Sequence, residues 1–213
     1  MPATRTRSSC GLSTDKEILQ IIQVVQIMQI RRMGAVMKKK LFTEIPCIEG
    51  PRLILKRVEE RDAEALAEMT QNPNVYRLLP TFLFEKKYAD AREVIRRLYD
   101  EAFRESIILG IYENGAFCGL AEFYGFRDPA HKISIGYRLP ERLWSRGIAS
   151  ETVRMMVDWL YTATDIEIIT ASTLPENTAS ANVLLKNGFD LVVSGSDEDW
   201  GYERPLPTDK WIR

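Results

Sequence analysis

The sequence predicts an α+β domain in which a mixed, mostly antiparallel sheet is flanked by helices on both sides. Segments that alternate between apolar and polar residues, as strands do, are interspersed with segments of helical periodicity. The dipeptide Asn114-Gly115 lies between two apolar runs and is a strong hairpin-turn signal. With 213 residues and 45% hydrophobic content, the chain can bury one sizeable core. The predicted order of elements is β-α-α-β-β-β-α-β-α-β-β.

Each element follows from its periodicity and from the turn residues beside it. Strands are expected at residues 52–58, 106–112, 116–126, 132–139 and 166–173, followed by a hairpin that pairs 189–193 with 199–204. Helices are expected at residues 61–69, 74–79 and 88–103, and again after the loops at 147 and 177. Asn72-Pro73 is expected to end the first helix, and Gly188 to end the last one.

The N-terminal segment, residues 1–36, differs from the rest. Its apolar residues are interrupted by glutamine at 20, 23, 26 and 29, so the polar stripe would wind around a helix. The apolar run is too short for a membrane span, and no small-residue cleavage site follows it. A helix that packs on the domain or on a partner, a targeting peptide, and translated sequence upstream of the true start all fit. The run Met37-Lys38-Lys39-Lys40 looks like an ordinary N-terminus and favours the last interpretation, with 1–36 a non-native or flexible extension and 37–213 a single domain.

Composition argues against several classes of function. A net charge of −1 and a pI near 6.0 do not suggest a nucleic-acid surface. The three cysteines, Cys10, Cys47 and Cys118, have neither disulfide nor metal-ligand spacing, which favours a reducing cytoplasm. The single histidine, His131, follows a turn and is expected at the surface, which argues against zinc or Ser-His-Asp chemistry. We therefore expect no metal, no nucleic acid and no membrane partner.

Residues 135–151 predict a strand, a short loop and the start of an amphipathic helix. A helix N-terminus offers unpaired N–H groups and partial positive charge, which suit a pyrophosphate. Gly147 and Ala149 would let a ligand approach the backbone closely. Their spacing fits neither the G-x-x-x-x-G-K-[ST] loop nor the G-x-G-x-x-G loop.

Two segments carry a family resemblance. Residues 144–149, Trp-Ser-Arg-Gly-Ile-Ala, resemble the acetyl-CoA loop Q/R-x-x-G-x-G/A of the GNAT N-acetyltransferase superfamily. Tryptophan in the first place is typical of its RimJ/RimL-like branch of ribosomal-protein N-acetyltransferases. That branch usually has Trp where this chain has Arg138, and Gly where it has Ser145. Residues 175–189 resemble the signature N-x-x-S-x-x-V-L-x-K-x-G-F of the same family.

The resemblance covers roughly residues 50–206 and implies the GNAT fold, with acetyl-CoA as co-substrate. The cofactor-binding residues that it implies are Tyr137, Leu139, Trp144, Ser145, Arg146, Gly147, Ile148, Ala149, Ser150 and Asn177. In the family, the asparagine meets the pantetheine arm or the loop that covers it. Taken alone, Asn177 also fits a helix N-cap.

The resemblance specifies the catalytic groups less closely than the cofactor-binding residues. Many relatives use a tyrosine on the last helix as general acid, but this chain has Leu184 there, which leaves Ser180, placed by the motif near the thioester sulfur. Some branch members carry a glutamate where this chain has Ser134, so we expect Glu122 on the preceding strand to act as the base. A solvated strand-face carboxylate is the other interpretation of Glu122. The resemblance also implies that strand 135–139 diverges from its neighbour, which leaves backbone N–H groups for the thioester oxygen.

The expected reaction is attack of a primary amine, such as a protein N-terminal α-amine, on the acetyl-CoA thioester. An acetyltransferase of a small amine (a polyamine, an amino acid or an antibiotic) is an alternative within enzymes. A non-catalytic acyl-CoA-binding module is an alternative of another class, because the usual tyrosine is missing. The sequence leaves the acceptor and a homodimer open.

Overall fold

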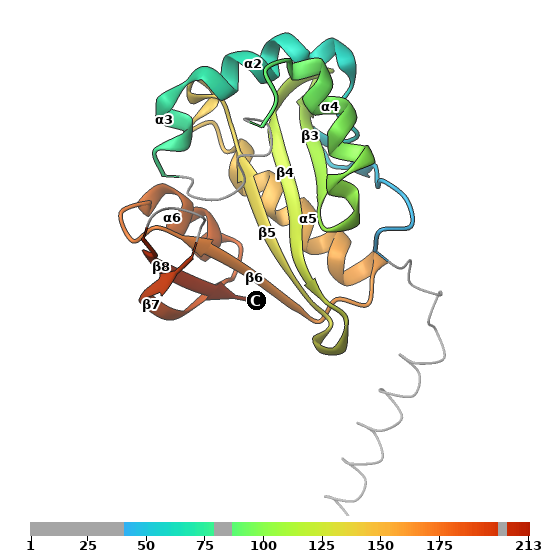
Figure 1. Ribbon diagram of the computed structural model, residues 1–213. Coiled ribbons are helices and arrows are strands. Elements are labelled where there is room, and N and C mark those ends of the chain that lie inside the picture. The colour runs from blue at the N-terminus through green and yellow to red at the C-terminus, as the bar shows by residue number, and fades with distance from the viewer. Residues whose placement is uncertain (1–40, 79–86, 200–203) are drawn as a thin grey trace, which may run out of the picture. The chain divides into compact units, whose positions relative to one another are not determined.

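The computed structural model describes residues 41–78, 87–199 and 204–213. The strands form one sheet in the order β1-β2-β3-β4-β5-β6-β8-β7 (Figure 1). Neighbouring strands run antiparallel, apart from β5 and β6, which are parallel. The strands are β1 Ile48–Glu49, β2 Leu53–Lys56, β3 Ile107–Glu113, β4 Ala116–Arg127, β5 Lys132–Arg138, β6 Ile168–Thr173, β7 Asp190–Glu198 and β8 Leu206–Ile212. The predicted α+β class and mostly antiparallel sheet are confirmed.

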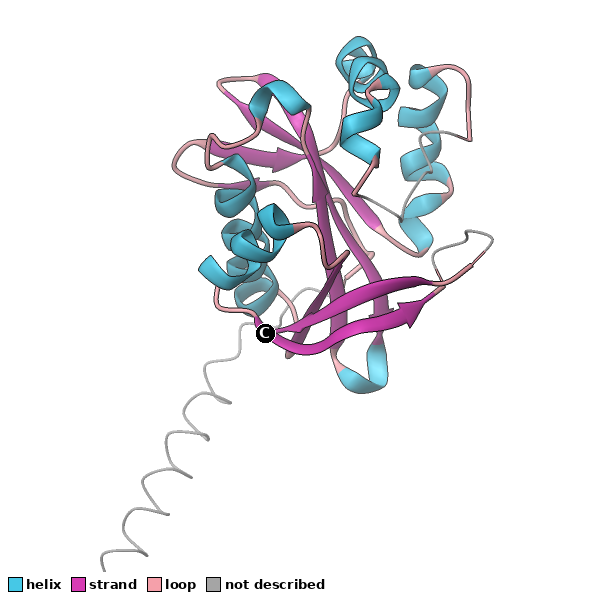
Figure 2. Cartoon of the chain, turned by 90° about the vertical axis from the view of Figure 1, so that its left-hand side faces the viewer, coloured by secondary structure: helices cyan, strands magenta, loops and turns pink. Residues whose placement is uncertain are grey.

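Helices cover both faces of the sheet (Figures 1 and 2). They are α2 Ala63–Gln71, α3 Pro73–Tyr76, α4 Ala91–Asp100, α5 Ile148–Ala163 and α6 Thr178–Lys186. One core cluster joins α2 and α4 to the sheet and contains Leu66, Leu98 and Ile108. A larger cluster joins α5 and α6 to the other face and contains Val153 and Leu184. Burial of these apolar side chains is the main stabilising contribution to the fold.

Strand alternation decides which side chains reach which face. On β4, Leu120 belongs to the α2/α4 cluster, whereas Ala121 and Phe123 belong to the α5/α6 cluster. Glu122 therefore points to the α2/α4 face, because successive strand residues point to opposite faces. The partner of Glu122 across the ladder is Gly136 on β5, so Gly136 shares that face.

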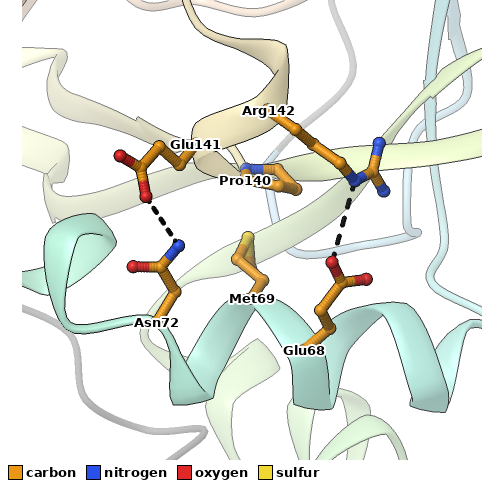
Figure 3. Close-up of a pocket in the computed structure, with 6 residues that line it drawn as sticks. All are labelled: Glu68, Met69, Asn72, Pro140, Glu141 and Arg142. Atoms are coloured by element: carbon orange, nitrogen blue, oxygen red, sulfur yellow. Dashed lines mark hydrogen bonds and ion pairs between the residues drawn. The ribbon is translucent and has the colours of Figure 1, made fainter.

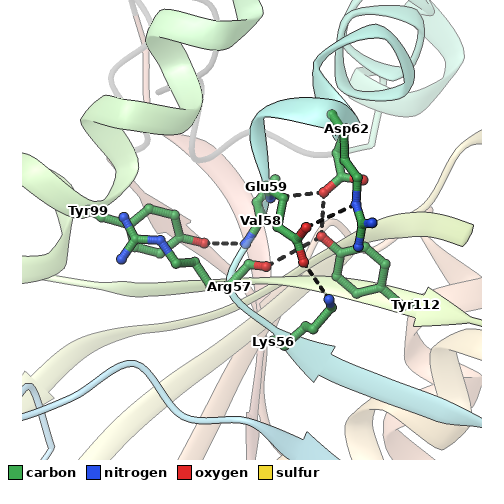
Figure 4. A network of polar contacts seen from close by, with 8 residues as sticks. Lys56, Arg57, Val58, Glu59, Asp62, Tyr99 and Tyr112 are labelled. Atoms are coloured by element: carbon green, nitrogen blue, oxygen red, sulfur yellow. Dashed lines mark hydrogen bonds and ion pairs between the residues drawn. The ribbon is translucent and has the colours of Figure 1, made fainter. Parts of the chain in front are cut away.

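A buried polar network fixes the turn that leads into α2 (Figure 4). The Tyr112 hydroxyl donates to Asp62 Oδ2 at 2.5 Å, and both side chains are buried. The Tyr99 hydroxyl accepts the Val58 N–H at 2.6 Å and donates to the Ile108 carbonyl at 3.1 Å. Burial raises the pKa of Tyr99 to about 12, and burial together with the bond to Asp62 raises the pKa of Tyr112. Both phenols therefore stay protonated as donors at neutral pH, which ties the start of α2 to β3.

The last hairpin differs from the sequence prediction. The predicted pairing of 189–193 with 199–204 is wrong, because β7 continues to Glu198 and its residues 190–193 pair with Lys210–Ile212 of β8, Leu206–Ile212. Residues 200–203 lie outside the described part of the chain. The segment Leu206–Ile212 carries Pro207 and several polar residues, which weaken its strand signal, yet Thr208 and Trp211 are buried. Its place in the sheet comes from pairing with β6 and β7, a contact that local periodicity does not reveal.

Other elements differ less from the boundaries predicted from the sequence. The helix predicted at 88–103 is α4, Ala91–Asp100, followed by the 3-10 turn η3, Ala102–Arg104. The helix predicted at 74–79 is α3, Pro73–Tyr76, and residue 79 lies outside the described residues. The short strand β1 was not predicted. Within the described ranges, no helix is long and apolar enough to cross a membrane.

Candidate active site

Strands β5 and β6 separate partway along their length. Their parallel pairing ends at Ser134↔Thr170, although β5 continues to Arg138 and β6 to Thr173. The far edge of β6 stays paired with β8 along this stretch. The second half of β5 thus presents a backbone edge to an opening between the two strands, as the family resemblance predicts.

The loop between β5 and α5 is exposed and shaped by two residues with positive φ. After the 3-10 turn η5, Glu141–Leu143, Ser145 has a φ of 60° and Gly147 a φ of 77°. The first hydrogen bond of α5 runs from the Glu151 N–H to the Gly147 carbonyl, at 3.1 Å. The N–H groups of residues 148–150 lie before it and have no acceptor within the helix. These amides and the positive end of a 16-residue helix can hold an anion.

The other predicted cofactor-binding residues divide between the core and this loop. Leu139 is buried, and its carbonyl accepts the Trp144 indole N–H at 3.0 Å. That bond directs Trp144 along the loop, where 43% of the residue is exposed. Arg146 is exposed and Ile148 is buried, so only the backbone N–H of Ile148 can serve a ligand. The side chains of the next two residues, Ala149 and Ser150, are half-buried.

Arg52, which sequence reasoning did not single out, braces this loop from the start of β2. Both terminal nitrogens of its guanidinium donate to the Arg146 carbonyl at 3.3 Å. Its Nε lies 3.2 Å from Glu113 Oε1 and 3.1 Å from Glu151 Oε2. The side chain therefore links β2, β3, the loop and the first turn of α5. Partners 94 and 99 residues apart give no local sequence signal.

A second set of contacts holds η5 against α2 (Figure 3). The Asn72 side-chain amide donates to Glu141 Oε2 at 3.0 Å, and the Asn74 amide donates to the same oxygen at 3.0 Å. These hydrogen bonds lower the pKa of Glu141. The contacts border a cavity of about 340 Å³ between α2 and η5. The turn after α2 thus positions the segment that leads into the loop.

Ser180 receives a hydrogen bond from a tyrosine on β5. The Tyr137 hydroxyl donates to Ser180 Oγ at 3.0 Å, and both residues are half-buried. Burial raises the pKa of Tyr137 to about 12, an effect that the bond to Ser180 partly offsets. Tyr137 is therefore a neutral donor at physiological pH. Leu184, at the family's tyrosine position, is 1% exposed and lies in the core.

Asn177 caps α6. Its Oδ1 accepts the Ser180 N–H at 3.1 Å, which matches the N-cap interpretation of this residue. Its side-chain amide also donates to the Leu78 carbonyl at 3.3 Å. Asn177 thus fixes the helix turn that carries Ser180 and ties it to the segment after α3.

Glu122 is buried beside an arginine. Glu122 and Arg138 are 6% and 5% exposed, and Arg138 Nη2 lies 3.6 Å from Glu122 Oε2. The interpretation of Glu122 as a solvated carboxylate is therefore wrong. The Arg138 guanidinium thus places a positive charge beside this carboxylate. Burial and the negative charge of Glu122 raise the pKa of Tyr124.

The two predicted catalytic residues lie on opposite faces of the sheet. Glu122 points to the α2/α4 face, while Tyr137 packs against the α5/α6 cluster and contacts Ser180 there. In the sheet order, β5 separates Glu122 on β4 from the opening between β5 and β6. Strand residues two apart point to the same face, so Tyr137 shares the face of Ile135, which belongs to the α5/α6 cluster. The alternation along β5 could therefore have placed Tyr137 on the Ser180 side from the sequence.

Comparisons with known proteins agree with this geometry. A family model described as an acetyltransferase (GNAT) domain matches residues 52–190. The N-acetyltransferase p20 of Bacillus licheniformis is 30% identical over 143 residues, which cover 65% of this chain and 79% of that protein. The solved structure of RimL, a ribosomal L7/L12 alpha-N-protein acetyltransferase in complex with coenzyme A, has a TM-score of 0.67 at 16% identity and covers 79% of this chain and 97% of that one. Mycobacterium smegmatis RimJ in complex with CoA-disulfide has a TM-score of 0.65 at 21% identity, with coverages of 79% and 87%.

Proposed function

Because this chain belongs to the GNAT acetyltransferase family, we propose that it transfers an acetyl group from acetyl-CoA to the α-amine at the N-terminus of a protein or peptide. The proposal rests on the opening between β5 and β6. The exposed loop between β5 and α5 (the α5 loop) follows β5 directly in the sequence. Acetyl-CoA supplies an activated acyl group. The solved structures of RimL and RimJ contain coenzyme A or its disulfide, and RimL is named for an alpha-N-protein substrate.

The α5 loop holds the pyrophosphate in this proposal. The exposed backbone of residues 144–147 and the first-turn amides of α5 provide the donors. A Cβ placed on Gly147 would meet only Arg52 Nη2, at 4.0 Å, so the space in front of this residue is open to a ligand. Within the described residues, no group of His, Cys, Asp or Glu side chains could hold a metal ion, and the proposed reaction uses none.

The proposed reaction uses groups on both faces of the sheet, with the base on one face and the proton donor for the thiolate on the other. Glu122 accepts a proton from the incoming ammonium, and the freed amine nitrogen attacks the thioester carbon from the Glu122 face. Backbone N–H groups at the open edge of β5 stabilise the oxyanion. As the carbon–sulfur bond breaks, Ser180 donates its proton to the leaving thiolate and takes the Tyr137 proton through the 3.0 Å hydrogen bond. The second proton that the attacking nitrogen must lose returns to Tyr137 through water, and Glu122 then releases the first proton to solvent. Tyr137 thus compensates for the missing tyrosine at position 184.

The most direct test is an acetyl-CoA turnover assay against a panel of amines. The panel should include peptides with free α-amines, polyamines and amino acids. Steady release of CoA with the peptides supports the proposal, and selective turnover of a small amine would replace it with a small-molecule acetyltransferase. Tight binding of acetyl-CoA without turnover on any amine would point to a binding module.

The free thiols of Cys47 and Cys118 support a reducing, cytoplasmic setting.

The Ser180→Ala variant should lower turnover by about ten- to a hundredfold, because a serine hydroxyl is a weak acid that contributes below the usual general-acid range. Acetyl-CoA affinity should stay close to wild type, since the Ser180 backbone N–H still donates to Asn177. Tyr137→Phe should also reduce turnover, because it removes the hydroxyl that resupplies the Ser180 proton. The double variant should therefore be little slower than the slower single variant. Fully additive losses in kcat would contradict the shared path.

The Arg52→Met variant should weaken acetyl-CoA binding by about three- to tenfold, a loss on the scale of one or two hydrogen bonds. The loop would lose the two bonds to the Arg146 carbonyl, while kcat at saturating acetyl-CoA should change little. Calorimetric titration with acetyl-CoA measures the effect. Arg61→Met, which removes an exposed arginine paired with Glu59 in the turn before α2, is the matched control and should bind normally. Equal affinities for both variants would show that Arg52 does not brace the loop.

A further inference from the structure

A cavity of about 580 Å³ opens beside Glu122, where β4 approaches its end. Its sheet side is formed by Ser106, Glu122 and Tyr124, and Phe42 and Phe126, which pack against the α5/α6 cluster, form an apolar wall. Ser106 and Glu122 are buried, at 5% and 6% exposure, so the floor of this cavity is part of the folded interior. Three exposed charged residues of both signs line it as well: Arg104, Glu105 and Arg127.

Two residues that line the cavity, Glu122 and Tyr124, lie against Gly136 on β5. This glycine is directly opposite Glu122 on the neighbouring strand β5. A Cβ at Gly136 would lie 3.5 Å from Tyr124 Cε1 and 4.0 Å from Glu122 Oε2. The absence of a side chain at Gly136 leaves room for the Tyr124 ring and the Glu122 carboxylate against this face of β5. An amine held by Glu122 therefore has β5 on one side and the cavity on the other.

The lining of the cavity favours an apolar occupant. Phe42 and Phe126 have ring centroids 5.8 Å apart, and Phe42 also contacts Phe103 at 6.1 Å, so the aromatic wall is packed rather than loose. A volume of this size lies within the range of ligand sites and exceeds the side chain of serine or alanine. Removal of apolar surface from water would favour a larger side chain in this place.

We propose that this cavity binds the side chain of the first residue of the acceptor, and that it selects a bulky apolar or aromatic one. The assignment rests on the proposed α-amine acetylation. The α-amine would lie at Glu122, the first side chain would enter between Tyr124 and Phe126, and the following residues would leave past the charged rim. The acceptor class is thus a peptide or protein that begins with a residue such as leucine or phenylalanine.

The test is acetylation of four peptides that differ only in their first residue, which is Ser, Ala, Leu or Phe. The wild type should show kcat/KM values about tenfold or more higher for Leu and Phe than for Ser and Ala, as expected for several methylene groups in an apolar pocket. Ser106→Leu should fill the cavity and lower the ratio of Phe to Ser rates by about tenfold. Ser106→Ala, which leaves the volume in place, should preserve that ratio. Because each variant is judged by a ratio, partial loss of folded protein does not imitate the effect.

The outcomes separate the two proposals. Efficient acetylation of the Ser and Ala peptides without preference for Leu or Phe would overturn the cavity assignment and leave α-amine acetylation intact. A preference for Phe that Ser106→Leu does not change would also overturn it, because the selectivity would then come from elsewhere. Turnover of small amines with none of the four peptides would overturn the proposed acceptor class, and the cavity assignment with it.

Discussion

Replacing Gly147 with valine should weaken acetyl-CoA binding by about tenfold to a hundredfold while the domain remains folded. Gly147 has a φ of 77°, a conformation that costs a β-branched residue of the order of 1–3 kcal/mol. The new side chain would meet little protein, because a Cβ at this position comes near Arg52 Nη2 alone, at 4.0 Å. It would instead extend into the space proposed for the pyrophosphate. Calorimetric titration measures the loss of affinity, and circular dichroism establishes that the variant is folded.

Gly195 offers a matched control for this substitution. Its φ of 64° is also positive, nothing lies within 4 Å of an added Cβ, and it belongs to β7 in the last hairpin. Gly195→Val should therefore carry a similar backbone cost without a change in acetyl-CoA affinity. If the two variants lost affinity equally, the effect would reflect general strain. An unchanged affinity in folded Gly147→Val would show that the pyrophosphate binds elsewhere.

The second large effect is expected for Glu122→Gln. Glutamine keeps the shape of the side chain but cannot accept the amine proton, so turnover near neutral pH should fall by about 10²- to 10⁴-fold. The rate should recover as the pH rises, because an α-amine with a pKa of about 8 deprotonates unaided in that range. The measurement is the pH profile of kcat/KM for the variant and the wild type. A variant that keeps the wild-type rate and profile near neutrality would remove Glu122 from the role of base.

This substitution also removes the negative charge that lies beside the buried Arg138. Breaking a buried ion pair on one side costs about 3 to 5 kcal/mol in general, so the variant should unfold at a lower temperature. The double variant Glu122→Gln with Arg138→Met removes both charges and should regain part of that stability. Its turnover near neutral pH should stay low. Recovery of turnover together with stability would mean that the single variant was slow because it was poorly folded.

The sequence predicted the parts of the fold and the site that depend on neighbours along the chain. Asn114-Gly115 gave the β3–β4 hairpin, with Asn114 and Gly115 both at positive φ. Gly188, at a φ of 74°, follows the end of α6 as expected. The loop before α5 was recognised because its small residues and the helix start lie together in sequence. Each of these signals depends on backbone conformation within a few residues.

The contacts that position the site could not be predicted in the same way. Arg52 reaches the loop across 94 residues, and Asn72 reaches Glu141 across 69. Arg138 appeared in the sequence as a departure from the family pattern, and the structure adds that it lies beside Glu122. Such pairs depend on sheet register and on the packing of α2, which no local pattern specifies.

The place of β8 in the sheet has a consequence for synthesis of the protein on the ribosome. β8 lies between β6 and β7, so β6 receives its second partner from residues near 210, long after its own residues have been made. Trp211 is buried there, and its indole N–H donates to Thr173 Oγ1 at 2.9 Å at the end of β6. A nascent chain that has released everything up to α6 still holds β6 with one free edge. The wall of the opening opposite β5 is therefore completed only after β8 has joined the free edge of β6.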